Sequence, residues 1–278
     1  MKGLAFSGLY IMMVWILFYE LDAIVIGKFL GVDKVAIYAI AWSFATLFRT
    51  IFGTLYSPFA IRVNHFIGIG DDKGLKSYCL QLISLSTPIV IISTVAFALV
   101  AKPFVLTWVG IKYMESINIA RLFSLLFTLS FISYSTSMFL TAKIRIKEMS
   151  IIATIQPVIY WLGVIFTHKQ WGLLSFAVFK LAATVVSEVC YLYLLIKLLE
   201  ISLKDIFKNT IYPILLPLMF LMASLTYVNS LFALDKSKYN LLLVLATTGA
   251  GITISLSIQY FTNSGIRSAV KNIVRNVT

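Results

Sequence analysis

The chain has 278 residues, of which 60% are hydrophobic and 12% are charged, and its mean hydropathy is +0.95. About a quarter of the residues of a soluble domain are charged, so this composition excludes a soluble protein and indicates an all-α membrane protein. The net charge is +12. Because no soluble domain is predicted that could present these basic residues to nucleic acid, we expect them to face anionic membrane lipids.

Eight stretches are long and apolar enough to cross a hydrocarbon core of about 30 Å as helices. In chain order they cover approximately residues 4–27, 35–60, 77–101, 117–141, 149–167, 171–196, 210–231 and 240–262. The connections between them are short. The sequence therefore predicts one polytopic transmembrane helix bundle over residues 1–262, followed by a basic cytoplasmic tail, residues 263–278.

The distribution of lysine and arginine indicates the orientation of this bundle. With the N-terminus inside, the inner loops hold thirteen basic residues and the outer loops hold eight. The positive-inside rule then predicts that both termini are cytoplasmic. The segment KLLEISLKDIFKN, residues 197–209, has Leu and Ile on one helical face and charges on the other, so we expect an amphipathic helix on the membrane surface.

Two carboxylates interrupt the first apolar stretch. At 100° per residue, Asp22 shares a face with Trp15 and Tyr19, whereas Glu20 points about 160° away from Asp22. The two acids are therefore not a catalytic pair. The first helix could leave the hydrocarbon near Tyr19 and place both acids at the interface, or Asp22 could face a polar cavity.

Other polar stripes run along the second and sixth spans. Trp42, Arg49 and Tyr56 share a face of the second span, with Arg49 too deep to reach the surface. The stripe of the sixth span consists of Lys180, Thr184, Ser187, Glu188 and Tyr191, and its Lys180 either snorkels or enters a cavity. A charge near the bilayer centre costs about 3 kcal/mol. We therefore expect a transport site in which cations hold an anionic head group and an acid exchanges a proton or sodium ion.

An enzyme is not expected, and no catalytic residue, metal ligand or cofactor is predicted. Enzymes that act on lipid-linked sugars would gather His, Asp, Glu or Arg in a sizeable surface loop. Here His65 and His168 lie on opposite sides of the predicted topology. The GIGDDKG stretch lacks the spacing of a phosphate-binding loop.

Four segments follow one another in an order that points to a known family. They are DAIVIGKFLGVDKVAIYAIAWSF, SPFAIRVNHFIGIGDDKGLKSY, KPFVLTWVGIKYMES and SMFLTAKIRIKEMSIIATIQPVIYWLGVIF. Over about residues 15–200 this pattern resembles the polysaccharide biosynthesis protein family, the O-antigen type oligosaccharide flippases of the multidrug/oligosaccharidyl-lipid/polysaccharide exporter superfamily. The remaining 80 or so residues match only in hydropathy.

This resemblance implies a flippase of the bacterial inner membrane. Such a protein moves an undecaprenyl-pyrophosphate-linked oligosaccharide to the outer leaflet by alternating access, without ATP hydrolysis. Cations in the cavity of such families attract the pyrophosphate, which is the role expected for Arg49 and Lys180, with Trp42 and Tyr56 beside them. Asp22 matches the position of acids implicated in ion coupling, and Glu188 is the second acid expected to take that role.

The chain departs from the family in length. Members usually have twelve to fourteen spans, and the matching segments resemble the second, C-terminal lobe. We therefore expect a partial chain that lacks a first lobe or pairs with a second subunit, or else a degenerate copy. The alternatives to a flippase are a non-transporting partner of glycan-assembly enzymes and a drug exporter of the same superfamily.

Overall fold

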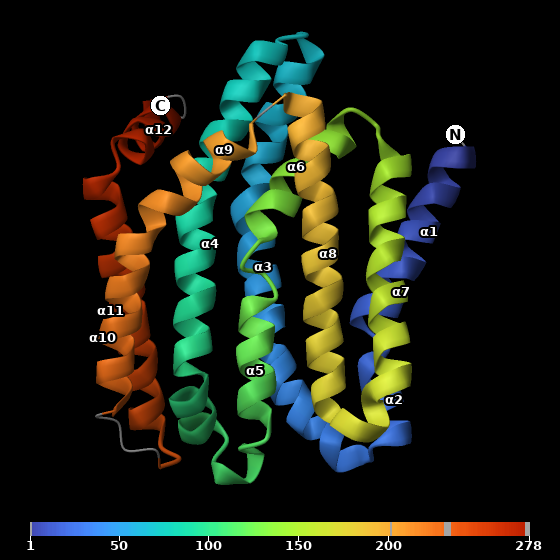
Figure 1. The fold of residues 1–278 in the computed structure, drawn as a ribbon, viewed down its shortest axis with the longest axis vertical. Coiled ribbons are helices and arrows are strands. Elements are labelled where there is room, and N and C mark those ends of the chain that lie inside the picture. Colours follow the sequence, from blue (N-terminus) through green and yellow to red (C-terminus); the bar gives the residue numbers. More distant parts are fainter. Residues whose placement is uncertain (1, 201, 231–234, 276–278) are drawn as a thin grey trace.

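Long helices dominate the computed structural model, which describes residues 2–200, 202–230 and 235–275 (Figure 1). No β-strand occurs among these residues. In chain order the elements are α1 (Lys2–Tyr19), α2 (Asp22–Phe29), α3 (Val32–Gly68), α4 (Asp72–Trp108), η1 (Ile111–Tyr113), α5 (Ser116–Leu125), α6 (Ser130–Ala142), α7 (Ile146–Trp171), α8 (Leu173–Leu199), α9 (Leu203–Ile206), η2 (Phe207–Ile211), η3 (Tyr212–Ile214), α10 (Leu215–Ser230), α11 (Lys238–Thr262) and α12 (Ser264–Arg275).

The number of membrane spans agrees with the prediction of about eight. Within the described part of the chain, seven helical segments are long and apolar enough to cross a membrane, and α5 and α6 together supply an eighth if they count as one bent span. The start of α1 and all of α12 lie at the same end of the bundle, as an even number of spans requires (Figure 1). The all-α fold class is thus confirmed, with seven to eight helical segments among the described residues that could span a membrane.

Helices α3 and α4 are longer than a membrane requires. Each has 37 residues, which corresponds to about 55 Å at 1.5 Å per residue. A hydrocarbon core is only about 30 Å thick. Residues 61–76, which the sequence places in a short connection between two spans, are mostly helical, and the turn between α3 and α4 lies at residues 69–71, where Asp71 caps α4 by accepting a hydrogen bond from the backbone of Gly74, at 2.9 Å.

Two of the predicted spans are broken. The first consists of α1 and α2, separated at Glu20 and Leu21. The fourth, expected as one helix over 117–141, consists of α5 and α6, which meet at 47°. The turn between them, residues 126–129, has the sequence LFTL, which is as apolar as the helices on either side. Hydropathy alone could not locate this break.

The segments outside the predicted spans are also largely helical. Residues 197–199 of the predicted surface helix complete α8, and Glu200 follows them with a φ of +50°. Helical structure begins again at α9 and continues through η2 and η3 into α10. The predicted tail contains α12, whose Ile266 and Ala269 are buried. Residue 201 of that surface helix and residues 276–278 of the tail lie outside the described residues.

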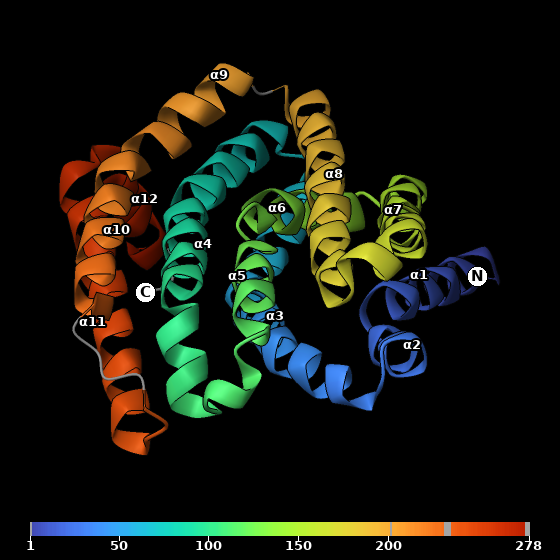
Figure 2. The same ribbon diagram turned by 60° about the horizontal axis from the view of Figure 1, so that its bottom comes forward.

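The helices form a main bundle with an added layer. Helices α1 to α8 share one core, whereas α10 and α11 pack on the other side of α4 around a smaller aliphatic core (Figure 2). In the main bundle α7 and α8 approach closely at Gly163, where a Cβ atom would lie 2.0 Å from the ring of Phe179. The candidate site lies inside this main bundle.

Candidate functional site

A polar cavity of about 230 Å³ lies between α1, α3, α6, α7 and α8. Arg49 and Glu188 line it, near the middle of α3 and α8 respectively. Hydroxyl and amide groups supply much of the remaining wall, from Ser130, Ser133, Ser137, Gln156, Thr184 and Ser187. The cavity therefore combines one cation, one carboxylate and several neutral hydrogen-bonding groups halfway along spans that are otherwise apolar.

Aromatic rings hold the guanidinium of Arg49 in place. Its Cζ atom lies 5.1 Å from the ring centroid of Trp15 and 5.3 Å from that of Tyr19, both on α1. The nearest carboxylate oxygen, from Glu20, is 3.9 Å from Nη1, which is too long for a hydrogen bond. Nη1 is buried and has no hydrogen-bond partner among the described residues. Arg49 is therefore positioned by ring faces, with donor capacity left over.

Glu188 connects α8 to the break between α5 and α6. Its Oε2 accepts a hydrogen bond from the backbone N–H of Ser133, at 3.0 Å. Ser133 lies in the first turn of α6, where backbone N–H groups lack helical partners and a negative charge is favoured by the helix dipole. The side chain is only 4% exposed, so the carboxylate stabilises a helix start that would otherwise lie unsatisfied inside the bundle.

A second cavity of about 230 Å³ adjoins the same break, and its wall is mostly apolar. Thr184 and Glu188 line both cavities. Gln156 adds a cross-link beside them, because its Nε2 donates to Ser187 Oγ at 2.9 Å and so joins α7 to α8. Glu188 consequently lies between the two cavities, beside the break between α5 and α6.

Asp22 and Lys180 form a separate, fully buried ion pair. The ammonium of Lys180 donates to Oδ2 of Asp22, and so does the hydroxyl of Tyr38. The hydroxyl of Tyr160 donates to Oδ1 at 2.6 Å. Asp22 also begins α2, where its charge is favoured by the helix dipole. The carboxylate thus has three donors, contributed by α3, α7 and α8.

The cation of this pair lies in an aromatic box. The Nζ atom of Lys180 is 4.3 Å from the ring centroid of Trp42, 4.7 Å from that of Tyr160 and 5.2 Å from that of Phe18. Such distances are typical of cation–π contacts. The side chain of Lys180 has no exposed surface, so the alternative in which it snorkels to the interface is wrong.

The six predicted site residues therefore fall into three groups. Arg49 and Glu188 line the cavity, together with Thr184, Ser187 and Tyr191 of the predicted polar stripe. Asp22 and Lys180 satisfy each other, and Trp42 covers the lysine. Tyr56 is buried outside the cavity wall and stacks on Tyr134, with ring centroids 4.7 Å apart.

Sequence reasoning missed several participants, among them Tyr38, Tyr160 and Gln156. None of these three carries a charge, so a search for ionisable groups inside apolar stretches passes over them. Their distances from Asp22 and Ser187 in the sequence, up to 138 residues, leave no local pattern that pairs them. Helical periodicity could have identified Tyr38, because it lies one turn before Trp42 on the predicted polar face of the second span.

Comparison with known proteins finds no family model that matches the chain and no match among curated proteins or solved structures. The structure itself gives the class. Its long apolar helices indicate a multi-pass membrane protein, and the polar cavity gives that bundle an interior site. Within the described residues, no three His, Cys, Asp or Glu side chains come together as a metal site would need.

Proposed function

We propose that the protein is a flippase that binds the anionic head of a lipid-linked oligosaccharide in the Arg49 cavity. The observation that carries this proposal is the state of Arg49: a cation in the middle of a span, held by two aromatic rings and left with a buried, unused donor. Ionisable groups at this depth usually mark a substrate or ion pathway. The resemblance of the sequence adds the substrate, an undecaprenyl-pyrophosphate-linked glycan of the bacterial inner membrane.

The chemistry of the cavity suits a phosphate group. A guanidinium presents several donors in one plane and binds phosphate oxygens in pairs. Hydroxyl groups of Ser133, Ser137 and Thr184 line the same space and can donate to further oxygens. Trp15 and Tyr19 position the guanidinium, and the carboxylate of Glu20 stays 3.9 Å away without a hydrogen bond, so Arg49 keeps a donor for a ligand.

The size of the cavity sets a condition on this proposal. About 230 Å³ accommodates a phosphate-sized group with some water, since a water molecule takes about 30 Å³. A whole oligosaccharide is larger. Transport therefore requires that the cavity widen, and the α5–α6 break offers a point where the fourth span can bend. A first lobe or second subunit would supply the opposite wall.

Glu188 is the better placed of the two expected coupling groups. It lines the same cavity as Arg49, so an ion or proton bound there would change the field that the substrate meets. Asp22 already has an internal cation and two tyrosine donors. We therefore propose Glu188 as the coupling residue and Asp22 as a structural residue that pairs with Lys180.

The direct test is binding of the lipid-linked substrate to the purified protein. Replacing Arg49→Ala removes charge-assisted hydrogen bonds, worth about 1.5–3 kcal/mol, so the affinity should fall about 10- to 100-fold. The matched control is Arg62→Ala on the same helix, because Arg62 lies over the rings of Phe66 and Tyr78, away from the cavity. Native mass spectrometry with an undecaprenyl-pyrophosphate sugar measures both.

A second measurement follows export in cells. The Arg49→Ala variant should insert normally but no longer support surface display of the glycan, while Arg62→Ala should support it. If both variants bind and export alike, Arg49 does not belong to the site. Stable cross-linking to glycan-assembly enzymes, combined with tolerance of changes at Arg49 and Glu188, would favour the scaffold alternative instead.

A further inference from the structure

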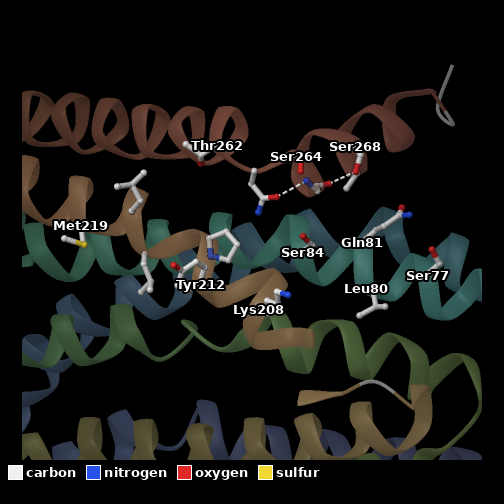
Figure 3. A pocket seen from close by; sticks show the side chains of 16 residues that line it. Ser77, Leu80, Gln81, Ser84, Lys208, Tyr212, Met219, Thr262, Ser264 and Ser268 are labelled. Carbon is white, nitrogen blue, oxygen red and sulfur yellow. Dashed lines mark hydrogen bonds between the residues drawn. The ribbon is translucent and has the colours of Figure 1, made fainter. Parts of the chain in front are cut away.

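A larger cavity, of about 870 Å³, lies outside the main bundle core, between α4, the start of α10 and α12 (Figure 3). It shares no lining residue with the Arg49 cavity. Drug-sized ligands occupy pockets of about 300–1,000 Å³, so this volume is large enough for a sizeable molecule. The proposed transport function makes no use of it.

The wall of this cavity changes character from one end to the other. Ser77, Gln81 and Ser268 lie toward one end in Figure 3, and Met219 lies toward the other. Leu215 and Leu216 of α10 extend the apolar end. A ligand that fills the space must therefore be amphipathic, with a hydrogen-bonding head and an apolar tail.

The charge of the wall is positive. Lys208 is the one charged residue among the described residues that line it. Lys208 belongs to η2, a single π-helical segment between α9 and α10, and such segments occur frequently at functional sites. A carboxylate head would also satisfy one lysine, but the abundant membrane amphiphiles with an anionic head carry phosphate.

The cavity lies where the apolar run of α10 begins, which is the depth expected for a lipid head group. Lys208 stands just before the apolar run of α10, and Tyr212, which is 74% exposed, follows it by one turn. Tyrosine is enriched where a span meets the membrane interface. The apolar residues that follow lie deeper, at the level of acyl chains.

We propose that this cavity binds one anionic phospholipid. Its phosphate pairs with Lys208, its head group accepts hydrogen bonds from Ser84 and Ser264, and its acyl chains run along Leu215 and Met219. The lipid fills the space between α4, the start of α10 and α12, and it thereby stabilises the packing of α12 against α4.

Native mass spectrometry on the whole purified chain tests the proposal. Phosphatidylglycerol and phosphatidylcholine with identical acyl chains are added separately, and the bound fraction is recorded. We expect phosphatidylglycerol to be retained preferentially, and Lys208→Gln to weaken its retention about fivefold, the contribution of one lysine beside an anionic lipid. The matched control is Lys204→Gln, an exposed lysine one turn earlier that does not line the cavity.

A second variant tests the cavity itself. Ser84→Phe places a ring inside the space and should displace either lipid, and elution of a monodisperse peak in size-exclusion chromatography confirms folding. Inorganic phosphate should not compete, because the apolar half of the site contributes to binding. Equal retention of both lipids, equal effects of Lys208→Gln and Lys204→Gln, or unchanged retention in Ser84→Phe would overturn the proposal. Arg49→Ala should leave lipid retention intact, which separates this test from that of the transport site.

Discussion

The buried ion pair of Asp22 and Lys180 gives the sharpest prediction about stability. Both side chains are within 3% of complete burial, so removing one charge leaves the other without compensation in a medium of low dielectric constant. Asp22→Asn keeps the shape of the carboxylate, and Lys180→Met keeps the length of the lysine stem. Each single variant therefore changes the charge with little change in packing.

The expected magnitude follows from these contacts. Breaking a buried pair by removing one partner costs about 3–5 kcal/mol, and about 3 °C of melting temperature corresponds to each kcal/mol in a chain of this size. Each single variant should therefore melt about 10 °C below the native protein. The double variant removes both charges, and the amide that replaces the carboxylate still meets the hydroxyls of Tyr38 and Tyr160. It should recover most of the loss, because neutral replacement of a whole buried pair is often close to neutral.

Fluorescence-detected size-exclusion chromatography after heating measures these melting temperatures in detergent. The pair formed by Lys143 and Asp72 is the matched control, since its atoms are 3.2 Å apart but its side chains are 35% and 81% exposed. Exposed pairs contribute about 0–1 kcal/mol, so Lys143→Met should shift the melting temperature by about 3 °C at most. The reasoning is refuted if the Asp22 and Lys180 single variants melt like this control, or if the double variant is no more stable than the weaker single one.

Two further predictions concern the neighbourhood of the cavity. Glu188→Gln keeps an acceptor for the N–H of Ser133, so it should fold normally but lose transport. Glu188→Leu should also lower the free energy of unfolding by about 1–3 kcal/mol, because that N–H is left unsatisfied. Melting curves and an export assay distinguish the two variants, and normal export by Glu188→Gln would remove Glu188 from coupling. Gly163→Ala should destabilise the protein by about 1–3 kcal/mol through overpacking against Phe179. Gly53→Ala is the control, because the structure has open space around the position of the added Cβ atom, and it should leave the melting temperature unchanged or slightly raised. Equal melting temperatures for the two glycine variants would contradict the close α7–α8 contact.

The sequence revealed the spans because hydropathy is a local property. A run of about 20 apolar residues identifies a helix that can cross the membrane, whatever its neighbours. The same local reasoning placed Thr184, Ser187 and Glu188 on one face of the sixth span, and these residues line the cavity. Helical periodicity fixes which side chains share a face, so this part of the site was accessible without a structure.

The partners of each charge were not accessible in the same way. Asp22 and Lys180 are 158 residues apart, and nothing in either span indicates that they meet. The break at residues 126–129 was equally hidden, because its apolar sequence reads as uninterrupted helix. Tertiary contacts decide both features: the break is stabilised by Glu188 of α8, which supplies the acceptor that the start of α6 lacks.

The contrast between Lys180 and Arg49 explains why only one of these cations is proposed to hold substrate. Both occur in apolar spans and look equivalent in the sequence. Lys180 has a buried carboxylate and an aromatic box around it, so a substrate would have to displace Asp22 to reach its charge. Arg49 has aromatic contacts but no hydrogen-bonded acid among the described residues. A ligand can add hydrogen bonds to Arg49 without breaking any, and that difference in free energy favours the Arg49 cavity as the place where an anionic head group binds.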